Sequence, residues 1–231
     1  MSNLVIGPVD NRFMRWITFD CFGTLVDWNT GFDAILRPIA ADKTPALIET
    51  YHRLERVLEA DSPHRLYRDV LTTGLRAAAD EIGVDFSDAQ GRALPEKWGS
   101  LPVFADVEPM LAGLRAEGYR LGVLTNCDDD LFAETQQSFL LPFDQVVTAE
   151  RVRDYKPSIS HFRFFTRTTG ATRENWVHVA RSWFHDITPA RELDVPRIWV
   201  DRDNTGEDPS AASVRVTSST EIHVAIMSLR S

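Results

Sequence analysis

Cysteine is scarce in this 231-residue chain, and long apolar runs are missing from its sequence. Its two cysteines, Cys21 and Cys127, show no metal-ligand spacing and form no disulfide framework. No apolar stretch approaches the length of a membrane span, and the first fifteen residues do not read as a secretory signal. These absences argue against a disulfide-stapled secreted protein and a membrane protein, and they predict a cytoplasmic one.

Basic residues are also few relative to acidic ones. The 25 lysines and arginines are outnumbered by 34 acidic residues, so the formal net charge is −9. Such a balance argues against a nucleic-acid groove or an anionic membrane surface as a partner. The hydrophobic fraction of 43% is that of an ordinary globular protein, long enough for one sizeable core and a small second domain. An anionic substrate would need a local cationic pocket.

The most informative stretch lies near the beginning of the chain. Residues Trp16–Phe19 form an aromatic and β-branched run that predicts a buried strand, and the carboxylate of Asp20 follows it directly. The carboxyl end of a parallel strand is where α/β proteins place their chemistry. Gly23 lets the backbone turn tightly behind Asp20, and Thr24 brings a hydroxyl within reach. From this stretch alone, a strand that ends in a turn-capping aspartate is an equally good interpretation.

After residue 28 the pattern becomes helical, and no strand-like run appears until about residue 119. Three helix-start signals divide this segment, at Thr44-Pro45, Ser62-Pro63 and Ser87. Apolar residues recur at helical spacing after the first two signals, and Gly83 is a stop signal. We predict a helical domain over residues 30–103, inserted into a core domain made of residues 1–29 and 104–231.

The second half of the chain alternates strands and helices. Strands are predicted over residues 119–125, 145–148, 176–180 and, as the last one, 197–200; helices are predicted over 108–117, 128–139, 160–169, 187–193 and 219–229. The polar stretch 201–213 is predicted to be a surface loop, and residues 1–15 are predicted to be an irregular leader before the first strand. Such alternation forms right-handed βαβ units. The predicted fold class is α/β, a Rossmann-like parallel sheet with helices on both faces.

The predicted strand ends carry polar side chains toward one crevice. They are Asp20 and Thr24, then Thr125 and Asn126, then Lys156 in a Tyr-Lys-Pro turn, and finally Ser182 and Asp186. Taken singly, a loop lysine is usually solvated and an aspartate before a helix is often a cap. Together, a nucleophile, a hydroxyl, an amide, a lysine and a second acid at successive strand ends indicate a catalytic site.

The order and spacing of these motifs resemble a known family. Asp20-x-Phe-Gly-Thr, Thr125-Asn126, Lys156-Pro157 and Ser182-x-x-x-Asp186 are similar to the motifs of the haloacid dehalogenase superfamily, over nearly the whole chain. The helical insert resembles that superfamily's cap domain in its C1 position. The chain length and the segment FDCFGTLVDW most resemble those of the type II 2-haloacid dehalogenases.

Two departures from the phosphatases of that superfamily bear on the chemistry. Those phosphatases have a second aspartate two residues after the nucleophile, where this chain has Phe22, and a magnesium-binding aspartate where it has Arg181. Phe22 can donate no proton, and a fixed cation repels a metal ion. A halide needs no proton to leave carbon. We therefore expect no metal and no cofactor.

The resemblance implies covalent catalysis on a small anionic substrate, a short 2-haloacid. Asp20 would attack carbon C2 and expel the halide, and water would then hydrolyse the ester and free a 2-hydroxy acid with inverted configuration. Lys156 would keep Asp20 deprotonated, and Asp186 would orient both Lys156 and the water. The remaining motif side chains would assist catalysis or bind the free carboxylate oxygens: Thr24, Thr125, Asn126 and Ser182.

The resemblance defines the anion site less completely. Members with well-formed sites have a cap arginine that receives the halide, and alignment on Leu54-Glu55 puts Thr50 in its place. His52, Arg53 and Arg56 lie near that position without matching it.

Several alternatives stay open at this level. Arg181 could bind the substrate anion, or it could point away and pair with a surface acid. Phe22, Trp28 and Trp183, with His185 beside them, could form an apolar wall around the halogen, or they could be plain core residues. A phosphatase-type or phosphonatase-type hydrolase and a catalytically silent ligand-binding relative are the alternative functions. The chain could also form a homodimer.

Overall fold

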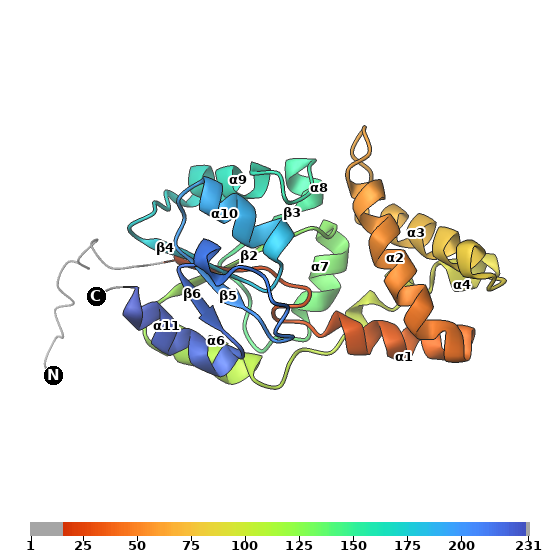
Figure 1. Cartoon of the computed structure of the whole chain (residues 1–231). Coiled ribbons are helices and arrows are strands. Elements are labelled where there is room, and N and C mark those ends of the chain that lie inside the picture. Colours follow the sequence, from red (N-terminus) through yellow and green to blue (C-terminus); the bar gives the residue numbers. More distant parts are fainter. Residues whose placement is uncertain (1–15, 230–231) are drawn as a thin grey trace, which may run out of the picture.

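A computed structural model describes residues 16–229, which are arranged around one six-stranded sheet (Figure 1). The strand order is β3-β2-β1-β4-β5-β6, and every pairing is parallel. The strands are β1 (Trp16–Phe19), β2 (Arg120–Thr125), β3 (Gln145–Thr148), β4 (Trp176–Ala180), β5 (Arg197–Val200) and β6 (Val214–Val216). The predicted α/β fold with a parallel sheet is confirmed, and the predicted leader lies outside the described residues.

Helices cover both faces of this sheet, as predicted (Figure 1). One face carries α8 (Ala149–Val152), α9 (Ser160–Thr169) and α10 (Thr188–Glu192), and the other carries α6 (Val107–Ala116) and α11 (Ile222–Ser228). Phe162 and Phe165 of α9 are buried against Trp176 of β4, which fixes that helix on the sheet. No helix within residues 16–229 is long and apolar enough to cross a membrane.

A group of helices, called the cap below, lies beside the sheet (Figure 1). It consists of α1 (Trp28–Ala40), α2 (Thr44–Glu59), α3 (Tyr67–Ile82), α4 (Asp88–Gly91) and α5 (Ala93–Glu96), followed by a short turn, η2 (Trp98–Ser100). The chain enters and leaves the cap side by side, because the Asp27 N–H donates to Pro102 O (2.7 Å) and the Phe104 N–H donates to Leu25 O (3.0 Å). The predicted domain boundaries, after residues 29 and 103, lie at this crossing and stay a prediction.

Two predicted helix starts in the cap are wrong. Helix α3 begins at Tyr67 and not at Ser62-Pro63, because a carboxylate of the core supplies its cap. Asp128 accepts hydrogen bonds from the N–H groups of Tyr67 (2.7 Å) and Arg68 (2.9 Å). Thr44 is the first residue of α2 and not the residue before it. A cap that comes from 60 residues away along the chain leaves no local sequence signal.

The number of strands also differs from the prediction. The strand 197–200 was expected to be the last, yet β6 pairs with it, and Ile198 lies opposite Val214 in register. Strand β6 has only three residues, with an arginine in the middle, so its apolar alternation is too short to stand out. Helix α7 (Asp129–Gln136) ends before the predicted residue 139. A single π-helical turn, η3 (Trp183–Ile187), precedes α10.

Candidate active site

The first strand delivers Asp20 to the carboxyl edge of the sheet. Its side chain is almost fully buried, and the Thr24 hydroxyl donates a hydrogen bond to its Oδ2 (2.9 Å). That hydroxyl in turn accepts the backbone N–H of Arg181 (2.9 Å), so Thr24 is fixed between β1 and β4. Gly23 has a φ of +93°, and a Cβ there would lie 2.9 Å from the Trp28 indole nitrogen. Only glycine fits this turn without strain.

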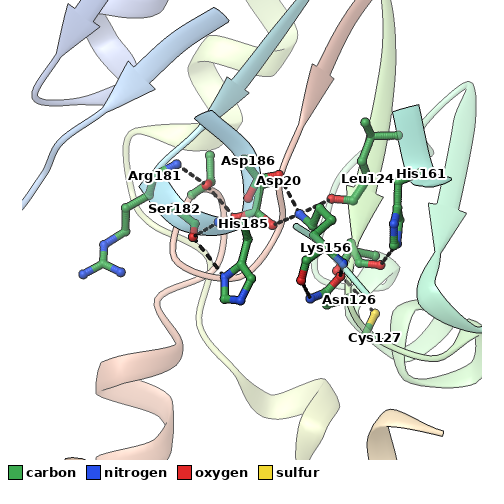
Figure 2. Close-up of polar contacts among 12 residues, drawn as sticks. Asp20, Leu124, Asn126, Cys127, Lys156, His161, Arg181, Ser182, His185 and Asp186 are labelled. Carbon is green, nitrogen blue, oxygen red and sulfur yellow. Dashed lines mark hydrogen bonds and ion pairs between the residues drawn. The ribbon is translucent and has the colours of Figure 1, made fainter. Parts of the chain in front are cut away.

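A buried ammonium group bridges two carboxylates beside this turn (Figure 2). Lys156 Nζ donates to Asp20 Oδ1 (2.8 Å), to Asp186 Oδ1 (2.7 Å) and to the carbonyl of Leu124 (2.9 Å). Its three hydrogens are therefore all used. Asn126 clamps the Lys156 backbone, since its Oδ1 accepts the Lys156 N–H (2.8 Å) and its Nδ2 donates to the Lys156 carbonyl (3.1 Å). The predicted nucleophile, lysine and second acid thus lie in contact.

Burial and charge act against each other on these three groups. Burial raises the pKa of Asp20 above its usual value, and Lys156 opposes part of that rise. Burial acts to raise the pKa of Asp186 as well, but Lys156 and His178 outweigh it and bring that pKa to about 2. Burial would lower the pKa of Lys156, yet the two carboxylates hold it above its usual range. Asp186 is therefore a carboxylate in the resting site at neutral pH, and the ionisation of Asp20 depends on Lys156.

A chain of buried hydrogen bonds supports Asp186 from inside the sheet. The Trp176 indole donates to Thr18 Oγ1 (2.7 Å), Thr18 Oγ1 lies 2.8 Å from His178 Nδ1, and His178 Nε2 lies 3.0 Å from Asp186 Oδ1. A carboxylate oxygen only accepts, so His178 Nε2 carries the proton toward Asp186 Oδ1, and the Thr18 hydroxyl, which accepts from the indole, is free to donate to Nδ1. The other oxygen, Asp186 Oδ2, is buried and accepts no hydrogen bond from residues 16–229.

These residues open onto a cavity of about 290 Å³ between the sheet edge and the cap. Of the predicted site residues, all of which lie in the described part of the chain, only Thr24 and Trp183 are not on its wall. Thr24 acts from behind, through Asp20. Of the two alternatives left open for Trp183, packing among core residues is the observed one, because its ring packs against Trp199 at 4.9 Å between centroids. The cap adds side chains that were not predicted as site residues: Phe32, His52, Glu55, Arg56, Glu59, Tyr67 and Trp98.

Comparison with known proteins identifies the family. A family model described as haloacid dehalogenase-like hydrolase matches residues 17–200, which hold five of the six strands and the whole cap. The chain belongs to this family. The hydrolase is 23% identical to an (S)-2-haloacid dehalogenase of Pseudomonas putida over 207 residues, 84% of this chain and 88% of the relative.

Two further comparisons define how far the similarity extends. A phosphoserine phosphatase of Thermus thermophilus is 32% identical to this hydrolase over 127 residues, 54% of this chain and 51% of the relative. The crystal structure of an L-2-haloacid dehalogenase matches with a TM-score of 0.84 at 21% identity, covering 93% of this chain and 99% of that one. At this identity, the structural likeness supports the fold alone.

The guanidinium of Arg181 is occupied elsewhere in this hydrolase. It points away from Asp20 in Figure 2 and forms an ion pair with Asp203, with its Nε donating to Oδ2 at 2.8 Å. Of the two alternatives that the sequence left open, the pairing with an acid near the surface is the observed one. Arg181 contributes its backbone N–H to the Thr24 hydroxyl instead. Arg53, which lies near the position of the missing cap arginine, pairs with Glu81 across the cap surface.

Ser182 and His185 form a turn on the cavity wall (Figure 2). Ser182 Oγ accepts the backbone N–H of His185 (3.1 Å) and lies 3.0 Å from its Nδ1. The Nε2 atom of His185 lies 3.6 Å from Glu59 of the cap, and this carboxylate outweighs burial and raises the pKa of His185. Within the described residues, the Ser182 side chain forms no hydrogen bond with Asp20 or Lys156, so its catalytic role stays a prediction.

Sequence reasoning also missed His178, whose contact with Asp186 provides a test. We expect His178→Phe to lower kcat roughly tenfold or more at unchanged KM, because Asp186 loses a charge-assisted hydrogen bond but the cavity wall stays as it is. His178→Gln, which keeps a donor, should recover part of the loss. Steady-state kinetics of both variants, beside their melting temperatures, would check this. An equal loss of kcat in both variants would show that the hydrogen bond from residue 178 to Asp186 does not contribute to turnover.

Proposed function

We propose that this hydrolase removes the halogen from short 2-haloalkanoic acids and forms 2-hydroxy acids through a covalent ester on Asp20. The observation that carries the proposal is the ammonium of Lys156, fixed 2.8 Å from Asp20 and 2.7 Å from Asp186. A buried carboxylate beside a buried cation is an ionised nucleophile without a hydration shell. The relative named (S)-2-haloacid dehalogenase supports a carbon–halogen bond as the target.

The first step is a displacement at carbon. A carboxylate oxygen of Asp20 attacks C2 of the substrate from the side opposite the halogen, a C–O bond forms, and the C–X bond breaks. The halide leaves with the electron pair, so this step moves no proton. Thr24 and Lys156 each hold one oxygen of Asp20, which fixes the direction of attack. Attack from behind inverts the configuration at C2.

The second step hydrolyses the ester and regenerates Asp20. Water attacks the ester carbonyl carbon, its proton passes to Asp186 Oδ2, and Lys156 stabilises the charge that develops on the carbonyl oxygen. The bond between the Asp20 carbonyl carbon and the ester oxygen then breaks, and the proton passes to the alkoxide that leaves as the 2-hydroxy acid. Asp186 lines the cavity and its Oδ2 accepts no hydrogen bond from residues 16–229, which supports this role.

A phosphatase is the second candidate, favoured by the 32% identity to a phosphoserine phosphatase over about half of the chain. Phosphatase chemistry needs a proton donor for the leaving oxygen near Asp20. Phe22 stands two residues after Asp20, and its ring packs on Trp98 at 4.6 Å between centroids, so it supplies no acid.

Metal dependence separates the two candidates. We expect halide release from 2-chloropropionate enantiomers or haloacetates to survive excess EDTA, because Lys156 supplies the cation that the two carboxylates need. Phosphoserine hydrolysis, assayed in parallel, should stay at the background rate. Activity that disappears with EDTA and returns with Mg²⁺, on either substrate, would favour the phosphatase. No activity and no covalent adduct on any of these substrates would favour a silent ligand-binding relative.

A further inference from the structure

The last residue of helix α2 places a carboxylate between the cap and the catalytic part of the core. Glu59 lines the cavity, and its side chain is only 7% exposed. Its Oε1 accepts a hydrogen bond from Asn126 Nδ2 (3.2 Å), and its Oε2 lies 3.6 Å from His185 Nε2. Within residues 16–229, every hydrogen bond and ion pair that joins α2 to the core runs through Glu59. The mechanism above uses neither contact.

A buried carboxylate at this place needs an explanation. Burial of an ionised group is costly unless charges or hydrogen-bond donors compensate it. The cavity wall already contains the carboxylates of Asp20 and Asp186, so a further acid adds repulsion. Burial raises the pKa of Glu59, against the hydrogen bonds of its partners. Both of these partners belong to the core, so the environment of Glu59 depends on the contact between cap and core.

Asn126 connects Glu59 to the catalytic lysine. Its amide is oriented by Oδ1, which accepts the Lys156 N–H (2.8 Å). The two hydrogens on Nδ2 then go to the Lys156 carbonyl (3.1 Å) and to Glu59 (3.2 Å). Glu59 therefore helps to fix the backbone from which the Lys156 ammonium reaches Asp20.

His185 connects Glu59 to the second acid, because it directly precedes Asp186 in the turn η3. Its Nε2 is buried and has no hydrogen-bond partner among the described residues. The Glu59 carboxylate, 3.6 Å away, is within ion-pair distance, and an approach of about half an ångström would form a hydrogen bond. Arg56, three residues before Glu59 and on the same helix face, stacks over Phe184 next to His185. One face of α2 thus contacts two consecutive residues of the core.

The charges of Glu59 and His185 strengthen this contact near neutral pH. Burial acts to lower the pKa of His185, but Glu59 outweighs it and raises that pKa above its usual value. The ion pair is therefore present above the pKa of Glu59 and is lost as pH rises through that of His185.

The titratable groups that face the pair keep their charge in this range. They are Tyr51, Glu55 and Tyr67 of the cap and Tyr155, Lys156 and Asp186 of the core. Burial raises the pKa values of the three phenols. Partner charges and hydrogen bonds, acting against burial, shift the pKa values of the other three groups away from neutrality.

We propose that Glu59 is a positioning residue that couples the cap to the catalytic centre. With the cap seated on the core, its carboxylate holds Asn126 on one side and His185 on the other, and these two residues keep Lys156 and Asp186 in place. With the cap displaced, the carboxylate returns to water, the Asn126 amide loses one of its three contacts, and His185 loses its counter-charge. The effect on turnover rests on the proposed dehalogenation, whereas the contacts themselves do not.

Proton NMR titration of the histidine rings tests the contact without any substrate. The chain has six histidines, and His185→Gln identifies the signal of interest. We expect the titration midpoint of His185 to fall in Glu59→Gln, which keeps the size of the side chain and removes its charge. Glu49→Gln makes the same change on the exposed side of α2 and should leave the midpoint unchanged. An unchanged midpoint in a folded Glu59→Gln protein would overturn the proposal.

Turnover tests the positioning role. In wild type we expect kcat for halide release from 2-chloropropionate to fall as pH rises through the midpoint of His185, because the ion pair is lost. In Glu59→Gln this decline should be absent, and kcat at neutral pH should be about 3- to 10-fold lower than in wild type. Glu59→Ala also leaves the Asn126 amide without its acceptor, so its kcat should be about 10- to 100-fold lower.

A purely structural role would give a different result. Glu59→Ala would then lower the melting temperature and leave kcat and its pH profile as in wild type, and that outcome would overturn the proposal. The two proposals of this article fail separately. A lower His185 midpoint in Glu59→Gln, in a protein that releases no halide, would refute dehalogenation and support the cap contact. Halide release that Glu59→Ala leaves unchanged at every pH would refute the positioning role alone.

Discussion

Asp20→Asn is expected to abolish halide release and leave the fold intact. The amide has the size of the carboxylate and can still accept from Thr24, but it is not a nucleophile. Loss of a covalent nucleophile lowers turnover by at least about 10³-fold in enzymes of this kind. Halide release and far-UV circular dichroism of the same preparation would check the expectation.

The control for this variant is Asp33→Asn in α1. Asp33 pairs with Arg37 on the exposed surface of the cap, so its loss should leave turnover as in wild type. Mass spectrometry would show that the amide of the Asp20→Asn protein has not reverted to the acid by deamidation. Undiminished turnover in the intact amide form would remove Asp20 from the role of nucleophile.

Lys156→Met is expected to have the second-largest effect, on both activity and stability. It leaves two buried carboxylates that were 2.8 and 2.7 Å from the ammonium without a counter-charge. Breaking a buried ion pair from one side costs about 3–5 kcal/mol of unfolding free energy. We expect kcat to fall at least about 10³-fold, because the pKa of Asp20, already raised by burial, rises further when the opposing cation is lost.

The stability of Lys156→Met should change with pH in the direction opposite to the contribution of Asp186 in wild type. In wild type the pKa of Asp186 is depressed to about 2, so its contribution to stability is present above its unfolded pKa and is lost as pH falls toward 2. Without Lys156 the buried carboxylates gain protons more readily in the folded state. The stability of Lys156→Met should therefore increase as pH falls from 7, down to the pKa values of its unfolded carboxylates.

Urea unfolding at pH 7 and pH 5 would measure that change, and Lys97→Met, an exposed lysine in the cap, is the matched control. If Lys156→Met is as stable as wild type at pH 7, or if its loss of stability relative to wild type is greater at pH 5 than at pH 7, the ammonium does not hold these carboxylates ionised.

Most of the sheet, and the grouping of the candidate site residues, could be predicted from the sequence because the signals are local along the chain. The strands β1, β3, β4 and β5 are short apolar runs bounded by turn residues, and the polar groups Asp20, Asn126 and Asp186 follow strand ends within six residues. Because parallel strands share one carboxyl edge, residues that follow them are brought together without any further information. The contact between Lys156 and both acids follows from the same rule.

The parts that could not be predicted depend on distant partners. Arg181 points away from the nucleophile because Asp203, 22 residues later, pairs with its guanidinium. His178 is one polar residue in an otherwise apolar strand, and its role becomes visible only beside Asp186. Trp98 and His52 reach the cavity only after the cap has packed against the sheet.

The central claim, a covalent ester on Asp20, is tested most directly by a single turnover in water enriched in the heavy oxygen isotope. Enzyme in excess over 2-chloropropionate allows each Asp20 to react at most once. The account predicts that the 2-hydroxypropionate is unlabelled, because its new oxygen comes from Asp20, and that the peptide containing Asp20 gains the label. Label in the product and none in the peptide would contradict the ester and place the attacking water at carbon directly.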